Sequence, residues 1–248
     1  GRRCIGIAGD ARTRGPDWMR ATLPAILAAL RATGARIVHY KMCSTLDSAP
    51  EVGSVGCAAE IGLQGGATAL MLVAAPRIGR WQVFGTLFAR HPGGVARLDR
   101  HPTMSRHPVT PMHEADVRRH LARQTELPVG LIDILDLRSD APAALAREKA
   151  AGARIVAVDL LDGASLMAAG RLLQGETAQG QAFVIGSQGV EDALVAAAVA
   201  DGHALPSPRP AGPVDRIVIG SGSCSPETAQ QIARAEAAGF AVIPLNAA

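Results

Sequence analysis

The chain has 248 residues, of which 48% are hydrophobic and 19% charged, as in ordinary globular proteins that bury a sizeable core. The formal net charge of +3 is small, and no Lys/Arg run is joined to aromatic residues, which argues against nucleic-acid binding. No apolar run reaches the roughly 20 residues of a membrane span, so no membrane partner is expected. The four cysteines form no CxxC pair, so we expect reduced thiols and a cytoplasmic location.

Short runs rich in Val and Ile alternate with longer Ala- and Leu-rich runs of helical spacing. The predicted strands are, in chain order, Cys4–Ala8, Arg36–Tyr40, Ala69–Ala74, Val129–Ile134, Arg154–Asp159, Ala182–Gly186, Arg216–Gly220 and Phe240–Pro244. The predicted helices are Pro16–Thr33, Glu114–Gln124, Ala141–Ala151, Gly163–Gln174, Gln188–Ala200 and Pro226–Ala238. Apolar strands separated by helices predict an α/β fold with a mostly parallel sheet covered by helices on both faces.

A Pro- and Gly-rich run, HALPSPRPAGPVD, is typical of a linker. We therefore expect a ligand-binding domain over residues 1–204, a linker over 205–213 and the start of a second α/β domain over 214–248. Because the chain opens without Met at a predicted strand and stops just after another, both domains are expected to be incomplete. Two long irregular stretches, Lys41–Gly56 and Ala75–Pro111, interrupt the first domain, and such stretches are usually functional.

The first stretch, YKMCSTLDSAPEVGSVG, follows a predicted strand and so lies at a carboxyl end, where open α/β sheets bind ligands. A cation, hydroxyls and a carboxylate are clustered in it: Lys41, Ser44, Thr45, Asp47 and Ser48. Such a set suits a polyhydroxylated carboxylate. The alternative is an ordinary helix start capped by serine. We favour the ligand site because the polar residues are so tightly grouped.

The second stretch also begins at a carboxyl end, with APRIGRWQVFG. Arg77 and Arg80 flank Gly79, which permits a sharp turn, and a guanidinium is suited to bidentate contact with a carboxylate or phosphate. A surface pair of arginines stacked on Trp81 explains the same residues equally well.

Further along, His-Pro pairs predict a rigid, non-helical loop from His101 to Pro111, which also contains Arg106. Its histidines lack a recognisable metal-ligand spacing, so no protein-bound metal is predicted there. In the amphipathic helix that follows, we expect His120 to be exposed to solvent.

Near the C-terminus, the predicted strand RIVIG runs into the turn GSGSCS and then into a helix beginning at Pro226. Backbone N–H groups and the helix dipole make this turn a candidate phosphate cradle. Its spacing partly matches a dinucleotide fingerprint, but the acidic residue expected after the next strand is replaced by Leu245-Asn246. An NAD-dependent oxidoreductase is therefore the disfavoured alternative. A similar turn, Gly186–Gly189, either reaches the same cleft or only caps its helix.

Five segments, in order over nearly the whole chain, resemble the four-carbon acid sugar kinase family: YKMCSTLDSAPEVGSVG, APRIGRWQVFG, RLDRHPTMSRHPVTPM, VIGSQGVEDAL and GSGSCSPETAQQI. The resemblance implies an N-terminal domain that binds a sugar acid and a C-terminal domain that binds ATP. With Mg²⁺, they transfer the γ-phosphate to a terminal hydroxyl of a tetronate, 3-oxotetronate or related acid. Cys43 and Asp47 depart from the family loop K-x-D-S-T-L-R-G-N and resemble a branch acting on altered acids such as 3-oxo-isoapionate.

The resemblance also implies roles for individual residues. Lys41 and Arg80 would hold the carboxylate, and Asp47 is the candidate base within the chain. The other expected substrate-binding residues are Ser44, Thr45, Ser48, Arg77, Gly79, His101 and Arg106. The expected nucleotide-binding residues are Ser223, Ser225, Thr228 and Gln231.

Two parts of the family pattern have no counterpart: the N-terminal Asp-Asp-x-Thr-Gly turn and the later Gly-rich nucleotide segments. The chain by itself is therefore not expected to catalyse transfer. A non-catalytic sugar-acid binding module stays as a second alternative to the kinase, and a homodimer is left open.

Overall fold

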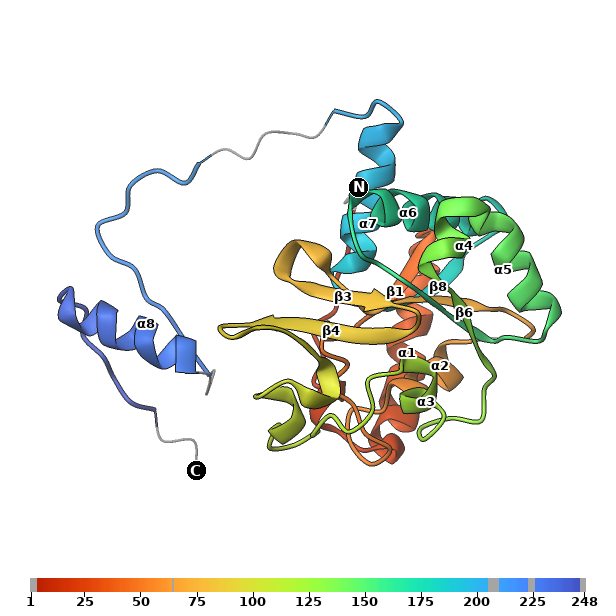
Figure 1. The fold of residues 1–248 in the computed structure, drawn as a ribbon. Helices are drawn as coiled ribbons and strands as arrows, with labels where there is room; N and C mark the ends of the chain where they lie inside the picture. The colour runs from red at the N-terminus through yellow and green to blue at the C-terminus, as the bar shows by residue number, and fades with distance from the viewer. Residues whose placement is uncertain (1–3, 64, 205–209, 223–225, 246–248) are drawn as a thin grey trace. The chain divides into compact units, whose positions relative to one another are not determined.

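The computed structural model describes residues 4–63, 65–204, 210–222 and 226–245, and the chain divides into two compact units, residues 1–205 and 206–248. The first unit is built on a five-stranded parallel sheet of order β1-β8-β2-β7-β6 (Figure 1). Its strands are β1 (Ile37–Lys41), β8 (Ala182–Gly186), β2 (Ala69–Leu72), β7 (Ile155–Val158) and β6 (Val129–Ile132). The predicted α/β fold with a mostly parallel sheet is confirmed.

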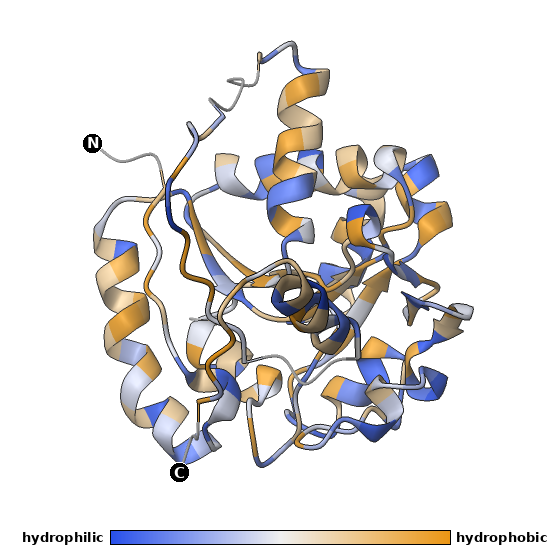
Figure 2. Ribbon diagram, turned by 90° about the vertical axis from the view of Figure 1, so that its left-hand side faces the viewer, coloured by the Kyte–Doolittle hydropathy of each residue, from blue (hydrophilic) through white to orange (hydrophobic). Residues whose placement is uncertain are grey.

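Helices cover both faces of this sheet. One face carries α1 (Pro16–Ala32), α2 (Val55–Gly62) and α3 (Val117–Leu121), and the other carries α4 (Ile134–Ser139), α5 (Ala141–Ala150), α6 (Gly163–Ala178) and α7 (Gly189–Ala200). Successive strand residues point to opposite faces, so Leu70 packs in one apolar cluster and Met71 in the other. In Figure 2 the helices carry both hydrophobic and hydrophilic residues, as expected of helices with one face on a sheet.

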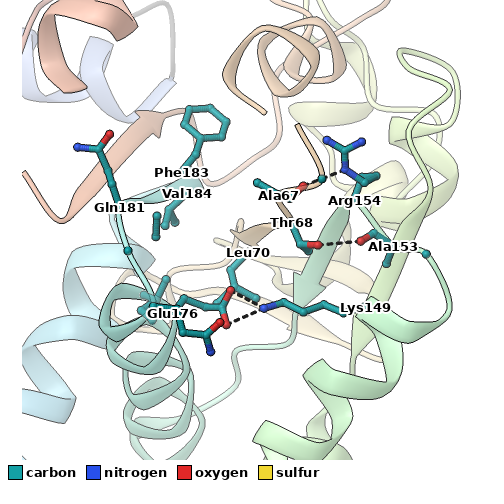
Figure 3. A pocket seen from close by; sticks show the side chains of 16 residues that line it. Ala67, Thr68, Leu70, Lys149, Ala153, Arg154, Glu176, Gln181, Phe183 and Val184 are labelled. Carbon is teal, nitrogen blue, oxygen red and sulfur yellow. Dashed lines mark hydrogen bonds and ion pairs between the residues drawn. The ribbon is translucent and has the colours of Figure 1, made fainter. Parts of the chain in front are cut away.

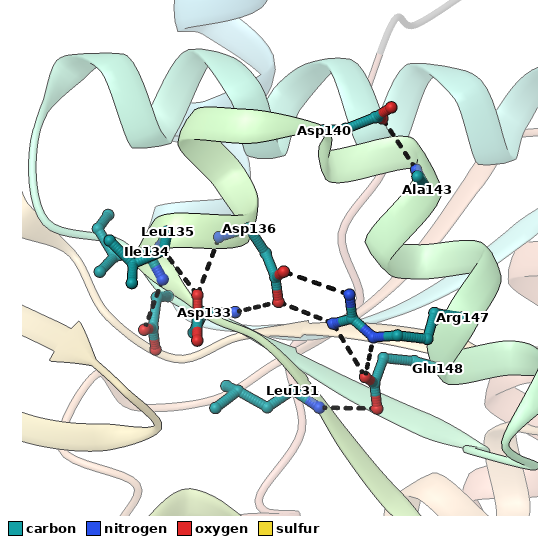
Figure 4. A network of polar contacts seen from close by, with 10 residues as sticks. Leu131, Asp133, Ile134, Leu135, Asp136, Asp140, Ala143, Arg147 and Glu148 are labelled. Atoms are coloured by element: carbon teal, nitrogen blue, oxygen red, sulfur yellow. Dashed lines mark hydrogen bonds and ion pairs between the residues drawn. The ribbon is translucent and has the colours of Figure 1, made fainter.

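A polar network fixes α4 and α5 beside the edge strand β6 (Figure 4). Asp133 follows β6 and caps α4, because its carboxylate accepts two backbone N–H groups of the first turn at 2.8 and 2.9 Å. Arg147 of α5 donates to Asp136 of α4 at 2.8 Å, and Glu148 accepts the backbone N–H of Leu131 at 3.4 Å. The helices are thus tied to each other and to the strand.

The stretch Ala75–Pro111, predicted to be irregular, instead contains a three-stranded antiparallel sheet of β3 (Arg80–Val83), β4 (Thr86–His91) and β5 (Gly94–Arg97). That prediction was wrong. Its two-residue hairpin turn, Phe84 and Gly85, has φ of 51° and 76°, the positive values that a type I′ turn requires. Three short 3₁₀ helices accompany the sheet: η2 (Pro76–Ile78), η3 (Leu98–Arg100) and η4 (Met104–Arg106).

Three predicted strands, Cys4–Ala8, Arg216–Gly220 and Phe240–Pro244, are not strands in the structure. A strand needs a neighbour for its backbone hydrogen bonds, and among the described residues these runs pair with none. Their apolar side chains stay in solvent, and Val218 is 97% exposed. In the second unit, helix α8 (Pro226–Ala237) forms as predicted, because helical hydrogen bonds are local.

Helices α6 and α7 lie so close that a methyl group added at Gly170 would overlap the Ala193 carbonyl oxygen. We expect Gly170→Ala to lower the free energy of unfolding by about 1–3 kcal/mol, the cost of overpacking. Gly175→Ala, on the same helix but with open space around it, should raise stability by up to about 1 kcal/mol through helix propensity. Urea denaturation of both variants checks this, and equal effects would contradict the packing argument.

Candidate ligand site at the carboxyl edge of the sheet

The chain leaves the adjacent strands β1 and β8 toward opposite faces of the sheet. After β1 it runs to α2, whereas after β8 it runs to α7, and these helices belong to different apolar clusters. Open α/β sheets bind ligands in the crevice formed at such a topological switch point. Lys41 ends β1 there, opposite Gly186, and its exposed ammonium donates to the Met42 carbonyl at 3.0 Å.

The polar side chains of the loop after β1 mostly face inward. Ser44, Thr45, Asp47 and Ser48 are all buried. The Asp47 carboxylate accepts the Thr45 hydroxyl and is paired with Arg12. The structure therefore brings the predicted loop residues together, but it uses these four to fix the loop rather than to line an open surface.

Helix α3 and the residues just after it hold the loop that follows β1 through hydrogen bonds to Ser48. Gln124, just after the helix, donates its Nε2 to Ser48 Oγ at 3.0 Å, and Ser48 donates to the Leu46 carbonyl at 3.2 Å. His120 Nε2 lies 3.0 Å from the same hydroxyl, so it acts as the donor.

The prediction that His120 is exposed was wrong, since it is 6% exposed. The helix is shorter than predicted, at Val117–Leu121. The side chain of His120 is buried because it hydrogen-bonds to Ser48, which lies 72 residues away in sequence. No local pattern contains that information.

Burial, with the nearby charge of Arg123, lowers the pKa of His120 from 6.5 to about 4. The folded state therefore favours the neutral ring, and stability is lost as pH falls from the unfolded value toward the folded one. Between pH 6.5 and pH 4 we expect this group alone to remove about 3 kcal/mol from the free energy of unfolding. Denaturation of His120→Gln should show a correspondingly smaller loss. Ser48→Ala, which keeps the His120 ring, should still lose stability as the pH falls. If the pH dependence of stability were the same in His120→Gln as in the wild type, the loss could not be assigned to His120.

The two arginines after β2 separate. Arg77 reaches α7, where its Nη1 lies 3.2 Å from an Asp192 carboxylate oxygen. Arg80 turns onto the hairpin and donates to the carbonyls of Gly79 and Arg90 at 3.1 and 3.4 Å. Gly79 supplies the left-handed turn between them, with φ of 72°. The alternative prediction, in which Arg77 and Arg80 stack on Trp81, was wrong. The guanidinium of Arg90 lies over that ring instead, 5.5 Å from its centroid.

The loop around His101 is fixed by its own histidines. His101 is buried, and its Nδ1 accepts the backbone N–H groups of Thr103 and Met104 at 3.2 and 3.3 Å. His107 Nδ1 likewise accepts the N–H of Thr110 at 3.0 Å, while Arg106 is exposed. Within the described ranges, no three His, Cys, Asp or Glu residues are placed to hold a metal ion.

At the start of α7, the sequence prediction missed two candidate residues, Glu191 and Asp192. Ser187 is fully buried and accepts the N–H of Gly189 at 3.0 Å, so the Gly186–Gly189 turn caps the helix. The next residues, Glu191 and Asp192, are the acids that meet the neighbouring strands. Glu191 accepts from His39 of β1 at 2.9 Å. Their only signal in the sequence is the pair of consecutive acids in VIGSQGVEDAL.

The electrostatics of Glu191 reflect this position. Burial acts to raise the pKa of Glu191, but the hydrogen bond from His39 and the charges of His39 and Lys41 outweigh it and lower the pKa below its usual value. The carboxylate is therefore held ionised at the edge of the sheet where Lys41 ends β1.

A buried carboxylate anchors the hairpin at the same edge. Asp159, directly after β7, accepts the backbone N–H groups of Phe84, Gly85 and Ile134 and the side-chain amide of Gln82. Burial raises the pKa of Asp159 despite these hydrogen bonds. The small sheet is thereby fixed beside the carboxyl ends of the strands.

A cavity of about 400 Å³ lies at the opposite, amino edge of the sheet (Figure 3). Lys149 donates to both carboxylate oxygens of Glu176 at 2.7 and 2.8 Å, and Arg154 donates to the carbonyls of Gly65 and Ala67 at 2.7 and 2.8 Å. Lys149 and Arg154 thus each make two hydrogen bonds to the protein, whereas one is described for Lys41 and one for Arg77, so the carboxyl edge is the better candidate for a ligand site.

The predicted nucleotide-binding residues fall in the second unit. Ser223 and Ser225 lie outside the described residues. Thr228 and Gln231 lie on α8, near its start. No helix in the described parts of the chain is long and apolar enough to cross a membrane.

Comparison with known proteins gives a consistent result. Residues 1–194 match the family model described as the sugar-binding N-terminal domain. The chain is 49% identical over 243 residues to a 3-oxo-isoapionate kinase of Paraburkholderia graminis, covering 96% of this chain and 52% of that protein. It is 34% identical over 219 residues to a 3-oxo-tetronate kinase of Methylobacterium radiotolerans, covering 84% and 49%. A crystal structure of a Haemophilus influenzae protein shares the fold, with a TM-score of 0.67 at 23% identity over 92% of this chain and 53% of that one.

The chain therefore belongs to the four-carbon acid sugar kinase family and carries its sugar-binding N-terminal domain. It spans about half the length of the curated relatives it matches.

Proposed function

We propose that the full-length protein is an ATP-dependent kinase that phosphorylates a terminal hydroxyl of a small sugar acid, and that this chain supplies the acid-binding part. The observation that supports it most is the exposed ammonium of Lys41 at the β1/β8 switch point, in a chain 49% identical to a 3-oxo-isoapionate kinase. A cation at that place suits the carboxylate of the substrate.

Among sugar acids, 3-oxo-isoapionate is the first candidate substrate, because the chain is 49% identical to a 3-oxo-isoapionate kinase. The other candidate substrates are acids of the 3-oxotetronate and threonate/erythronate type. The chain is less similar to the 3-oxo-tetronate kinase, at 34% identity. A cytoplasmic location and a homodimer stay predictions.

The site residues take three kinds of role in this proposal. Lys41 and Arg77 contact the carboxylate. Asp47, which is paired with the exposed Arg12, is the base within this chain. The remaining predicted substrate-binding residues shape the loops that carry these groups: Ser44, Thr45, Ser48, Gly79, Arg80, His101 and Arg106.

In the reaction, the terminal hydroxyl oxygen of the acid bonds to the γ-phosphorus of ATP, the bond to the β,γ-bridging oxygen breaks, ADP leaves and the hydroxyl proton passes to the base. Catalysis of this kind rests mainly on positioning and charge neutralisation. Mg²⁺ would enter with the nucleotide, since the described residues offer no carboxylate cluster for it. The turn from Ser223 to Thr228 is the proposed phosphate cradle.

The two lysines of the chain, Lys41 and Lys149, provide a matched test because they lie at opposite edges of the sheet. In the full-length protein, Lys41→Ala should raise KM for the sugar acid by about 10- to 100-fold, the value of a hydrogen bond to a charged group. KM for ATP should not change. Lys149→Ala should leave both constants within about twofold. Steady-state ATP consumption with 3-oxo-isoapionate and the tetronates measures this.

Three outcomes would contradict the proposal. Equal effects of the two lysine substitutions would remove Lys41 from the site. Binding of sugar acids without ATP consumption would favour the non-catalytic module. Thermal protection of the full-length protein by NADH and not by ATP would favour the oxidoreductase.

A further inference from the structure

Two consecutive acids at the start of α7 contact basic side chains from the segments on either side of β8. Glu191 contacts His39 of β1 at 2.9 Å, and Asp192 contacts Arg77 after β2 at 3.2 Å. Since β8 lies between β1 and β2, the first turn of α7 follows the carboxyl end of β8, beside the ends of those two strands. The two acids therefore lie at the same carboxyl edge of the sheet as Lys41, which ends β1.

These ionic groups differ from the hydroxyls of the loop after β1 in what a ligand can reach. The side chain of Arg77 is 69% exposed and that of Asp192 is 19% exposed, whereas the loop hydroxyls are buried. The observed contact uses one of the five N–H donors of the guanidinium and one of the roughly four acceptor positions of the carboxylate. A donor and an acceptor thus stand side by side with capacity left for a ligand.

An exposed ion pair of this kind adds little to the stability of the fold. A contribution to folding stability therefore does not by itself explain why Arg77 and Asp192 are paired. A 2-hydroxy carboxylate presents the complementary pattern, because its carboxylate accepts hydrogen bonds and the adjacent hydroxyl donates one.

We propose that Arg77 and Asp192 form the specificity-determining pair that selects a carboxylate bearing a hydroxyl on the neighbouring carbon. Arg77 donates to the carboxylate, and Asp192 accepts the hydrogen of the 2-hydroxyl while orienting Arg77. Glu191, which accepts from His39, lies at the same carboxyl edge as Lys41, the second group proposed to bind the carboxylate. This inference rests on the proposed function. It adds which part of the acid the protein recognises, namely the carboxylate together with the 2-hydroxyl.

The test uses the full-length protein and three probes: threonate, erythronate and 3,4-dihydroxybutanoate, which lacks the 2-hydroxyl. By calorimetry, the wild type should bind at least one tetronate about tenfold or more tightly than 3,4-dihydroxybutanoate, a difference of about 1.4 kcal/mol. Asp192→Asn keeps the size of the side chain and an oxygen that accepts the 2-hydroxyl, but it removes the charge that makes this hydrogen bond about twice as strong. The variant should therefore bind all three acids within about threefold of one another. KM for ATP should stay as in the wild type, which a general loss of structure would not allow.

Asp201→Asn is the matched control, because Asp201 follows the other end of α7 and lies 3.9 Å from Arg171. It should discriminate among the acids as the wild type does. If Asp192→Asn keeps the wild-type preference for the 2-hydroxyl, or if the wild type has no such preference, the inference is overturned. Neither result contradicts the proposed kinase function. If the wild type neither binds nor phosphorylates any sugar acid, the proposed function fails and the inference fails with it.

Discussion

The insertion of β8 between β1 and β2 is the constraint on which the rest of the structure depends. β8 is the last strand of the first unit in sequence, yet it pairs in parallel with both β1 and β2. Its backbone comes so near to its neighbours that a Cβ at Gly186 or Gly189 would meet the carbonyls of Leu72 or Ala74. This insertion sends α7 to the face opposite α2, and the switch point between β1 and β8 is its direct result.

Much of the fold follows from local patterns in the sequence. Apolar runs predicted every strand of the parallel sheet, and helical spacing predicted its main helices, because both patterns record which side chains are buried. The small antiparallel sheet was missed since its outward face is apolar too: Trp81 and Phe88 face outward as partly exposed side chains, so polar alternation is absent. The runs at the two ends have strand composition, but composition supplies no pairing partner.

The candidate site was only partly predictable for a different reason. Lys41 could be placed at a carboxyl end from the order of elements alone. The burial of Asp47 and His120, in contrast, depends on Arg12 and Ser48, which are distant in sequence. The contacts of Glu191 with His39 of β1 and of Asp192 with Arg77, which follows β2, depend on the strand order, and a single sequence does not contain that order.

The close contact of α6 and α7 has a consequence for binding as well as for packing. Because Gly170 allows the backbone of α6 to reach that of α7, α7 is wedged between its neighbour and the sheet and has little room to slide or rotate. Side chains on its first turn are consequently presented in a nearly fixed frame. A ligand that docks there loses little free energy to ordering the protein, so discrimination between similar acids can come from geometry alone.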